Sequence, residues 1–259
     1  MLLTVAYDGA DFAGFARQKE ARTVAGELDG AVRAIDPTAS LVRGASRTDS
    51  GVHALGQRVA FDSALDIPPR GWALAIARHS SSEISVVRAA RVAPGYDPRG
   101  HARQKTYRYV LFCSRVRDPF LSRRAWRVEE RLNHDLLREE ADALVGRHDF
   151  RAFRTSSDQR VDTVRTIFRI DVRPGAPDPR CIALEIQGDR FLHRMVRIIV
   201  GTLVDVSRGR LAPGATRRAL ASGERNALGI TAPPDGLYLV EIELDDEGAD
   251  NWPDHLSSR

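Results

Sequence analysis

The run Gly44-Ala45-Ser46-Arg47-Thr48-Asp49-Ser50-Gly51-Val52-His53-Ala54 joins two apolar, strand-like segments, residues 40–44 and 58–62. Its Asp-x-Gly core is typical of a turn, because Asp hydrogen-bonds its own backbone two residues on and Gly adopts positive φ. The run therefore predicts a tight connection between two strands. A carboxylate held at a strand end can also act as a nucleophile, a base or an electrostatic stabiliser. The residues alone leave these alternatives open.

The segments around this run predict a compact α+β half. Residues 23–35 place Val24, Leu28, Val32 and Ile35 at helical spacing, with Thr23 as a plausible N-cap. The remaining expected elements are a first strand at 2–8, a helix at 72–78 and a strand at 84–92. The resulting order, β-α-β-β-α-β, is that of a ferredoxin-like unit.

The rest of the chain predicts a second unit of similar order. Its expected strands are 106–113, 163–172, 181–187 and 237–244, and its expected helices are 134–145, 191–206 and 215–221. We expect an α+β fold with two ferredoxin-like halves related by a pseudo-two-fold axis, an extended, mostly antiparallel sheet and flanking helices. The halves are placed at 1–100 and 101–259, with a cleft between them and a frayed polar tail at 245–259.

Composition excludes several classes of protein. The chain has 259 residues, of which 42% are hydrophobic and 29% charged, as in an ordinary soluble globular protein. No apolar run reaches the roughly 18 residues of a membrane span, and the N-terminus does not resemble a signal peptide, so we expect a cytoplasmic protein. Cys113 and Cys181 are expected to be free thiols. No metal-ligand spacing or nucleotide-binding glycine pattern is present, and we expect no metal and no cofactor.

Positive charge is concentrated in one part of the sequence. The formal net charge is +4, although residues 235–259 hold eight acidic residues and a single Arg. Between Arg99 and Arg127 there are nine Arg or Lys residues and one acidic residue, interleaved with aromatics at 107, 109, 112, 120 and 126. Such a stretch is typical of RNA binding, in which cations contact phosphates and rings stack on bases. A solvated strand with core aromatics would give the same composition.

Five motifs together resemble one known family. The Asp49 run is similar to the Arg-Thr-Asp-x-Gly-Val-His-Ala signature of the tRNA pseudouridine synthase A family. Further resemblance lies, in the family's order, at Tyr7-Asp8-Gly9 with residues 12–18, at Lys105-Thr106-Tyr107-Arg108-Tyr109, at residues 191–203 and at Gly236-Leu237-Tyr238-Leu239. The chain is therefore identified as a member of this family, and the resemblance covers nearly its whole length.

The resemblance implies a fold and a reaction. It implies the pseudouridine synthase fold with a central basic cleft, and isomerisation of uridine to pseudouridine in tRNA. That reaction breaks the bond from N1 to C1′ and joins C5 to C1′, with no redox change. The resemblance assigns the catalytic carboxylate to Asp49. Whether Asp49 attacks the sugar, attacks the base or assists elimination stays open.

Arg197 can be considered first without the family. Its helix is apolar almost all round, which predicts burial, and a buried guanidinium needs an anion. A structural ion pair elsewhere or an Arg reaching the surface would also satisfy the pattern. The resemblance implies that Arg197 pairs with the carboxylate of Asp49 and keeps it ionised.

The resemblance also assigns two substrate-binding residues. Tyr107 would stack on the target base, although alternating Tyr107 and Tyr109 in a strand are usually core residues. Arg47 would enter the RNA and hold the target nucleotide flipped out, although an Arg beside a turn is often only a surface residue. His53 and Gln57 are expected to order the loop rather than to act in the chemistry.

The expected substrate and assembly also follow from the resemblance. It implies uridines thirty-eight to forty of the anticodon stem-loop, and a homodimer that binds tRNA but neither DNA nor a membrane. Two alternatives remain: the same chemistry on other uridines or another RNA, and an RNA-binding or RNA-folding protein without turnover. Three stretches depart from the family pattern, namely Phe15, Tyr96-Asp97-Pro98-Arg99 and Asp189-Arg190. They put RNA contacts in doubt rather than the reaction.

Overall fold

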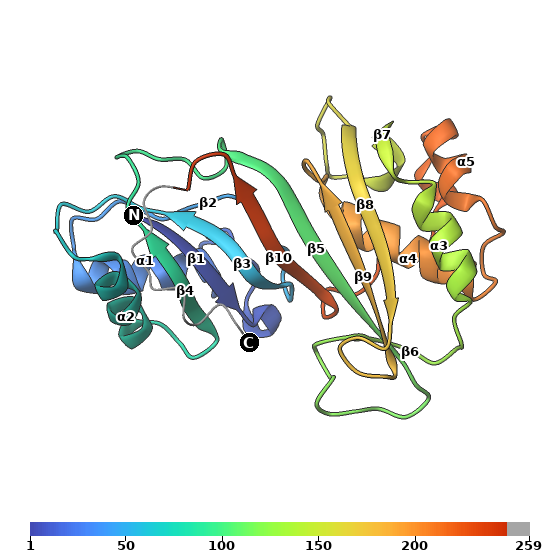
Figure 1. Cartoon of the computed structure of the whole chain (residues 1–259), viewed down its shortest axis with the longest axis horizontal. Coiled ribbons are helices and arrows are strands. Elements are labelled where there is room, and N and C mark those ends of the chain that lie inside the picture. The colour runs from blue at the N-terminus through green and yellow to red at the C-terminus, as the bar shows by residue number, and fades with distance from the viewer. Residues whose placement is uncertain (248–259) are drawn as a thin grey trace. The chain divides into compact units, whose positions relative to one another are not determined.

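The computed structural model describes residues 1–247, which form two compact units (Figure 1). Among these residues, the first unit contains Met1–Arg103 and residues 239–247, and the second contains Gln104–Tyr238. The C-terminal chain thus returns to the first unit. The division into catalytic halves at 1–100 and 101–259 stays a prediction, as does the cleft between them.

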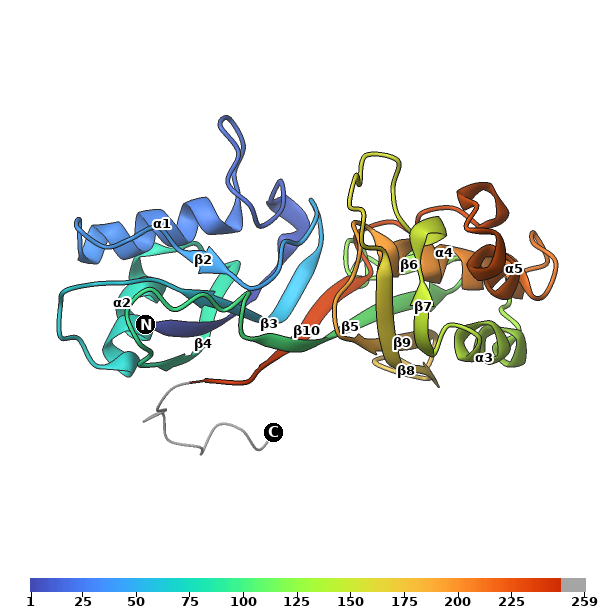
Figure 2. The ribbon, with the colours of Figure 1, turned by 90° about the horizontal axis from the view of Figure 1, so that it is seen from above.

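The first unit has the predicted β-α-β-β-α-β order. Its elements are β1 (Leu2–Tyr7), α1 (Val24–Ile35), β2 (Arg43–Gly44), β3 (His53–Ala60), α2 (Pro69–His79) and β4 (Ile84–Ala90), with a short 3-10 turn at Gly9–Asp11. Strand β1 lies between β4 and β3, β2 pairs with β3, and all these pairs are antiparallel. Figure 2 shows α1 on one side of these strands.

Local sequence explains how this unit is built. The hydroxyl of Thr23 accepts a hydrogen bond from Gly26 N at 3.2 Å, so Thr23 is the predicted N-cap of α1. Helix α1 buries Val24, Leu28 and Val32 at the predicted helical spacing. Alternate residues of β1 and β3 pair on one face of the sheet, as in Leu3 with Val59, and both of these side chains are fully buried.

The second unit repeats this order with additions. Its elements are β5 (Ala102–Cys113), β6 (Trp126–Val128), α3 (His134–Asp142), β7 (Gly146–Asp149), β8 (Val164–Pro174), β9 (Cys181–Gly188), α4 (Met195–Ser207), α5 (Ala215–Ser222) and the start of β10 (Leu237–Leu244), with 3-10 turns at Arg151–Phe153 and Arg225–Ala227. The strand order is β5-β9-β8-β7, antiparallel throughout, and β6 pairs parallel to β5. The predicted α+β class with a mostly antiparallel sheet is confirmed.

Some predicted boundaries were wrong. Strand β2 covers only Arg43 and Gly44 of the expected 40–44, whereas β3 begins at His53 rather than 58 because residues 54–60 pair with β1. Helix α4 begins at Met195 rather than 191, because Arg194 has a φ of 59° and so interrupts the helical backbone. A left-handed residue of this kind is not visible in an apolar pattern.

The start of the predicted frayed tail is held in place. The Asp245 carboxylate pairs with His101 at 2.8 Å and with Arg103, and the Tyr96 hydroxyl donates to the carbonyl of Asp246. Glu247 pairs with Arg58 at 3.3 Å. The prediction of fraying was therefore wrong for residues 245–247, and the rest of the predicted tail lies outside the described residues.

Two further predictions concern the whole chain. Cys113 and Cys181 are free thiols, as predicted, and burial raises the pKa of both. Across residues 1–247, none of the helices is both long enough and apolar enough to pass through a bilayer.

Candidate active site

Asp49 opens the turn that the sequence predicted between β2 and β3. The amide of Val52 donates to the carbonyl of Asp49 at 3.2 Å, and Gly51 has a φ of 77°. An i to i+3 hydrogen bond with positive φ at the third residue is the arrangement that type II turns require. Gly51 supplies that conformation without strain. Asp49 is half-buried in the loop between β2 and β3, which fits a group that is both held and reachable.

The loop of residues 8–15 packs tightly against the Asp49 turn. Phe15 N donates to the carbonyl of Thr48 at 3.1 Å, and Gly51 N donates to the carbonyl of Phe12 at 3.3 Å. A Cβ at Gly9 would lie 1.9 Å from the carbonyl oxygen of Val52, and one at Gly14 would lie 2.8 Å from that of Thr48. Both glycines therefore allow two backbones to approach where a side chain would not fit.

A buried polar network fixes the residues that precede Asp49. Gln57, which is fully buried on β3, accepts from Ser46 N at 3.2 Å and donates to Ser46 O at 2.8 Å. The Tyr7 hydroxyl bonds the Thr48 hydroxyl at 2.8 Å. His53 Nδ1 accepts from Gly9 N at 3.1 Å and lies 3.0 Å from a carboxylate oxygen of Asp8. These contacts fit the expectation that Gln57 and His53 order the loop. Tyr7 orders the same loop through its hydrogen bond to Thr48.

Replacement of Gln57 by Leu is expected to lower the free energy of unfolding by about 1–3 kcal/mol, because it removes both hydrogen bonds that the buried Gln57 amide makes to the backbone of Ser46. Denaturant unfolding of the purified protein measures this. Gln18→Leu is the matched control, since the Gln18 amide is exposed where it donates to Ala13 O. Equal stabilities of the two variants would contradict the proposed part played by Gln57.

Tyr107 lies in the second unit, on β5. It pairs with Ile186 of β9, is 7% exposed, and meets the ring of Phe191 edge-on with the ring centroids 5.1 Å apart. Edge-on contact is a favoured geometry for two aromatic rings and helps to fix the orientation of the Tyr107 ring. Phe191 belongs to the turn before α4 and is half-buried.

Tyr109 is a core residue, which agrees with the alternative stated for aromatics alternating in this strand. It is fully buried, and its hydroxyl donates to the carbonyl of Pro233 at 2.7 Å. Burial raises the pKa of Tyr109 well above its usual value, and the positive charge of Arg197 opposes this shift. Arg197 of α4 therefore acts electrostatically on the phenol of this strand.

Helix α4 is buried as predicted, except at Arg197. Twelve of its thirteen residues are buried, and Arg197 is half-buried. Its Nε donates to the carbonyl of Ala232 at 2.8 Å, and Ala232 N donates back to the carbonyl of Arg197 at 3.0 Å. A Cβ at Gly201 would lie 1.9 Å from the carbonyl oxygen of Ile230. The space beside Gly201 is thus occupied by the segment 229–233, to which Arg197 is hydrogen-bonded.

The four predicted site residues divide between the two units. Arg47 and Asp49 lie in the first unit, two residues apart in the loop between β2 and β3, and Arg47 is exposed. Tyr107 and Arg197 lie in the second unit, on β5 and α4. The roles of these residues, and the pairing of Arg197 with Asp49, stay predictions.

Sequence reasoning did not identify the residues that support the site. Tyr7, Gly9 and Gly14 hold the Asp49 turn, and Ala232 holds Arg197. The first three belong to the family motif at residues 7–18, so the sequence did mark them as part of the resemblance. The motif does not show that this loop contacts a turn about forty residues further along the chain.

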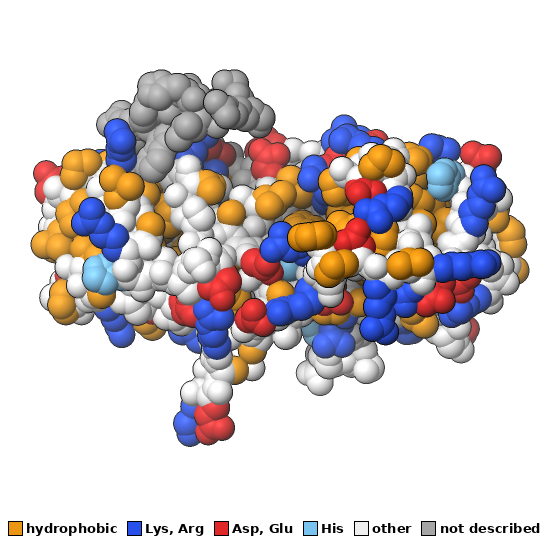
Figure 3. All heavy atoms as spheres, turned by 90° about the horizontal axis from the view of Figure 1, so that it is seen from below, with side chains coloured by type: hydrophobic (Ala, Val, Ile, Leu, Met, Phe, Trp, Pro, Cys, Tyr) orange, Lys and Arg blue, Asp and Glu red, His pale blue; other side chains and the backbone are white. Residues whose placement is uncertain are grey.

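In the basic stretch of residues 99–127, arginines of the strands form ion pairs, and arginines of one loop are exposed to solvent. On β5 and β6, Arg108 pairs with Glu185 at 2.6 Å and Arg127 with Glu129 at 2.7 Å. The loop of residues 114–125, here called the Arg loop, exposes Arg115, Arg117, Arg123 and Arg124. Figure 3 shows the face seen from below, where the Lys and Arg side chains in blue gather over the second unit with acidic side chains in red between them.

Aromatic residues of the basic stretch differ in their exposure to solvent. Tyr107, Tyr109 and Phe112 are buried, as the alternative interpretation expected of core aromatics. Phe120, within the Arg loop, is 86% exposed. An exposed ring among cations is the combination that stacking on nucleobases requires.

The residues that depart from the family pattern mostly make packing or hydrogen-bonding contacts within their own unit. Phe15 is buried, and its ring lies over Gly44. A Cβ at Gly44 would lie only 2.3 Å from the Phe15 ring. Tyr96 is buried and stacks on His101, with the ring centroids 4.4 Å apart. Asp189 accepts a hydrogen bond from Thr166 N at 3.0 Å, and Arg190 is exposed. Phe15, Tyr96 and Asp189 thus support their own units.

Comparison with known proteins agrees with these motifs. A family described as tRNA pseudouridine synthase matches residues 141–245. Proteins named tRNA pseudouridine synthase A from Agrobacterium fabrum and Pseudothermotoga lettingae are 37% and 38% identical, over 94% and 93% of this chain and 92% and 97% of their own. One from Paraburkholderia phymatum is 38% identical over 93% of this chain and 89% of its own.

One solved structure was also compared with this chain. A chain from a Cbf5-Nop10-Gar1 complex aligns with 95% of this chain and 60% of its own, at 10% identity and a TM-score of 0.37, which is too low to bear on the fold. The sequence relatives are decisive, because the alignment covers nearly the full length of this chain and of each relative. The chain belongs to the tRNA pseudouridine synthase A family.

Proposed function

We propose that this protein isomerises uridine to pseudouridine in tRNA, at positions thirty-eight to forty of the anticodon stem-loop. It is an isomerase of the tRNA pseudouridine synthase A family. The observation that supports the proposal best is the intact Arg47-Thr48-Asp49 motif on a turn fixed by buried hydrogen bonds. The choice of these three uridines, a cytoplasmic location and action as a homodimer rest on the resemblance.

Asp49 is assigned the reaction at the sugar. The N1–C1′ bond breaks, the base turns, and C5 bonds to C1′; C5 then loses its proton and N1 gains one, so that product and substrate are isomers. A carboxylate beside C1′ either bonds to that carbon or stabilises the positive charge that develops there. The half-buried, tightly held position of Asp49 suits this task, because a fixed charge needs no reorganisation during the reaction.

Tyr107, Arg197 and Arg47 are assigned to the substrate. Tyr107 stacks on the target base, and its phenol assists removal of the C5 proton. Arg197 supplies the positive charge that keeps the Asp49 carboxylate ionised. Arg47 is exposed beside the turn, where a guanidinium can enter the RNA stack and hold the target nucleotide out of it.

The Arg loop is assigned to binding of the tRNA body. Its exposed arginines neutralise phosphates, and Phe120 offers a ring for an unpaired base. Binding through phosphates releases counterions, so affinity falls steeply with salt.

The double variant Arg115→Gln with Arg117→Gln is expected to weaken tRNA binding and to reduce the slope of log affinity against log salt by up to about two. Titration of labelled tRNA at several salt concentrations measures both quantities. Arg33→Gln with Arg78→Gln, which removes two exposed charges from α1 and α2, is the matched control and should change neither. The same slope in the two double variants would remove the Arg loop from the tRNA interface.

Incubation of the purified protein with an unmodified anticodon stem-loop transcript tests the proposed function. Pseudouridine is expected at one or more of the three positions, without any added cofactor. Tight binding without turnover would instead support the RNA-binding alternative. Turnover confined to other uridines or to another RNA would support the same chemistry with a different substrate.

A further inference from the structure

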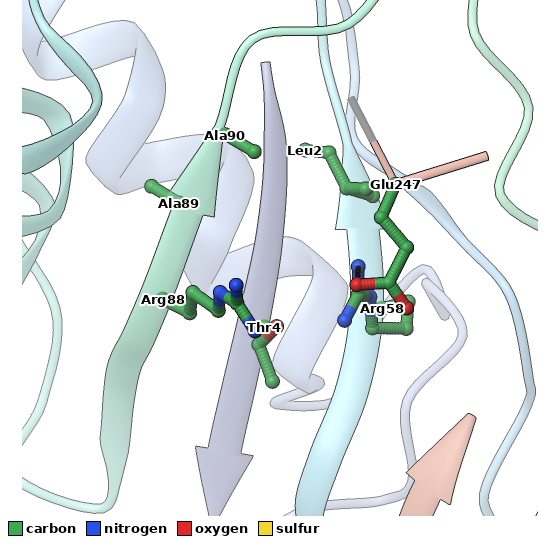
Figure 4. A pocket seen from close by; sticks show the side chains of 7 residues that line it. All are labelled: Leu2, Thr4, Arg58, Arg88, Ala89, Ala90 and Glu247. Carbon is green, nitrogen blue, oxygen red and sulfur yellow. Dashed lines mark ion pairs between the residues drawn. The ribbon is translucent and has the colours of Figure 1, made fainter. Parts of the chain in front are cut away.

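A polar pocket lies on the sheet face of the first unit that is turned away from α1. Thr4 pairs with Arg58 on β3 and with Arg88 on β4, so the three side chains form one row across three strands and lie on the same face. Figure 4 shows them on the near side of the sheet together with Glu247, with a helix behind the strands. They line a cavity of about 40 Å³, here called the Arg58 pocket, whose walls include Leu2 and Ala90.

The guanidinium of Arg58 is buried without a full set of partners. Arg58 is only 8% exposed, and its Nε makes no hydrogen bond to any residue between 1 and 247. Such a donor is costly unless an acceptor reaches it. Because Nε and a terminal nitrogen of Arg point the same way, an anion with two oxygens can accept from both at once.

Glu247 meets this requirement only in part. One of its carboxylate oxygens lies 3.3 Å from a terminal nitrogen of Arg58, while Nε stays unpaired, and the Glu247 side chain is 42% exposed. Glu247 follows the last strand, within a run of three acidic residues. Its carboxylate is thus an imperfect and removable acceptor at the mouth of the pocket.

Two arginines in one row also favour a ligand with more negative charge than a carboxylate. Arg58 and Arg88 stand on either side of β1, so their backbones are roughly 10 Å apart and their side chains can both reach over Thr4. A tetrahedral anion offers enough oxygens for both guanidinium groups and for the Thr4 hydroxyl. Arg recognises phosphate in this way.

We infer that the Arg58 pocket binds a phosphate group, held by Arg58, Arg88 and Thr4, and that Glu247 competes with it. The phosphate is either a free ion or part of an RNA backbone. Binding at this pocket involves neither Asp49 nor any other residue assigned to the reaction, so the inference does not depend on the proposed function.

Titration calorimetry of the full chain with inorganic phosphate, at constant ionic strength, tests the inference. Arg88→Gln is expected to weaken phosphate binding at least about tenfold, because it removes one charge-assisted hydrogen-bonding group. Glu247→Gln is expected to tighten binding several-fold, since it removes the competing charge. Arg78→Gln, an exposed arginine on α2, is the matched control and should leave binding unchanged.

Opposite effects of Arg88→Gln and Glu247→Gln support the pocket. Phosphate binding that is the same in wild type, Arg88→Gln and Glu247→Gln would overturn it, as would an equal loss in Arg78→Gln. A second arm identifies the source of the phosphate: if it belongs to RNA, Arg88→Gln also lowers the salt slope of tRNA binding by about one. An unchanged tRNA slope, with loss of inorganic phosphate binding, assigns the pocket to the free ion.

Discussion

Asp49→Asn is expected to lower pseudouridine formation by at least about a thousandfold, while the fold and tRNA affinity stay as in wild type. Asn has the size of Asp and is equally at home in Asx turns, so the hydrogen bond from Val52 N to the carbonyl of residue 49 should persist. The substitution removes only the negative charge and the nucleophilic oxygen. The hydrogen bonds that Gln57 makes to Ser46 and Tyr7 makes to Thr48 stay available to hold the loop in this variant.

Single-turnover assays on an anticodon stem-loop transcript, alongside binding of the same RNA, separate chemistry from affinity. Asp66→Asn is the control, because Asp66 is an exposed carboxylate of the same unit paired only at the surface with Arg91. Turnover of Asp49→Asn near the wild-type rate would remove Asp49 from the reaction and leave its turn as a purely structural feature.

Arg197→Met is expected to lower turnover by at least about a hundredfold, with a smaller effect on stability. Met packs well on an apolar helix, and the lost hydrogen bond from Nε to Ala232 O costs only about 1 kcal/mol. The expected loss of activity comes from the missing positive charge, which would otherwise favour the ionised form of a carboxylate.

Comparison of Arg197→Met with Arg197→Lys distinguishes charge from anchoring. Lys keeps the charge but cannot reproduce the geometry of Nε, so partial activity in Arg197→Lys with none in Arg197→Met would assign the effect to charge. Arg169→Met, at an exposed position of β8, is the control for general loss of positive charge. Full activity of Arg197→Met would show that the assignment of Arg197 is wrong.

Sequence patterns predicted best those parts of the fold that depend on local rules. Thr23 caps α1 as expected, because a capping hydroxyl and a helical apolar stripe lie within one short segment. Positive φ at Gly51 also follows from residues in the same turn. The apolar residues around Arg197 correctly predicted a buried helix, although not the half-exposure of Arg197 itself.

Contacts between distant segments could not be predicted in this way. The support that Gly9 and Gly14 give to the Asp49 turn depends on two backbones meeting across many residues of sequence. The pairing of Asp245 with His101 and Arg103 likewise depends on where the chain end returns, and a polar, acidic sequence alone suggested fraying. The periodicity of apolar residues predicts single helices and strands, whereas these contacts depend on how the helices and strands pack together.

The most direct test is pseudouridine mapping of tRNA from cells that contain this protein and from cells in which it has been deleted. The account predicts that pseudouridine at positions thirty-eight to forty disappears on deletion. It also predicts return of the modification with the wild-type gene and not with Asp49→Asn. Unchanged modification at all three positions in the deleted cells, or full restoration by Asp49→Asn, would contradict the account.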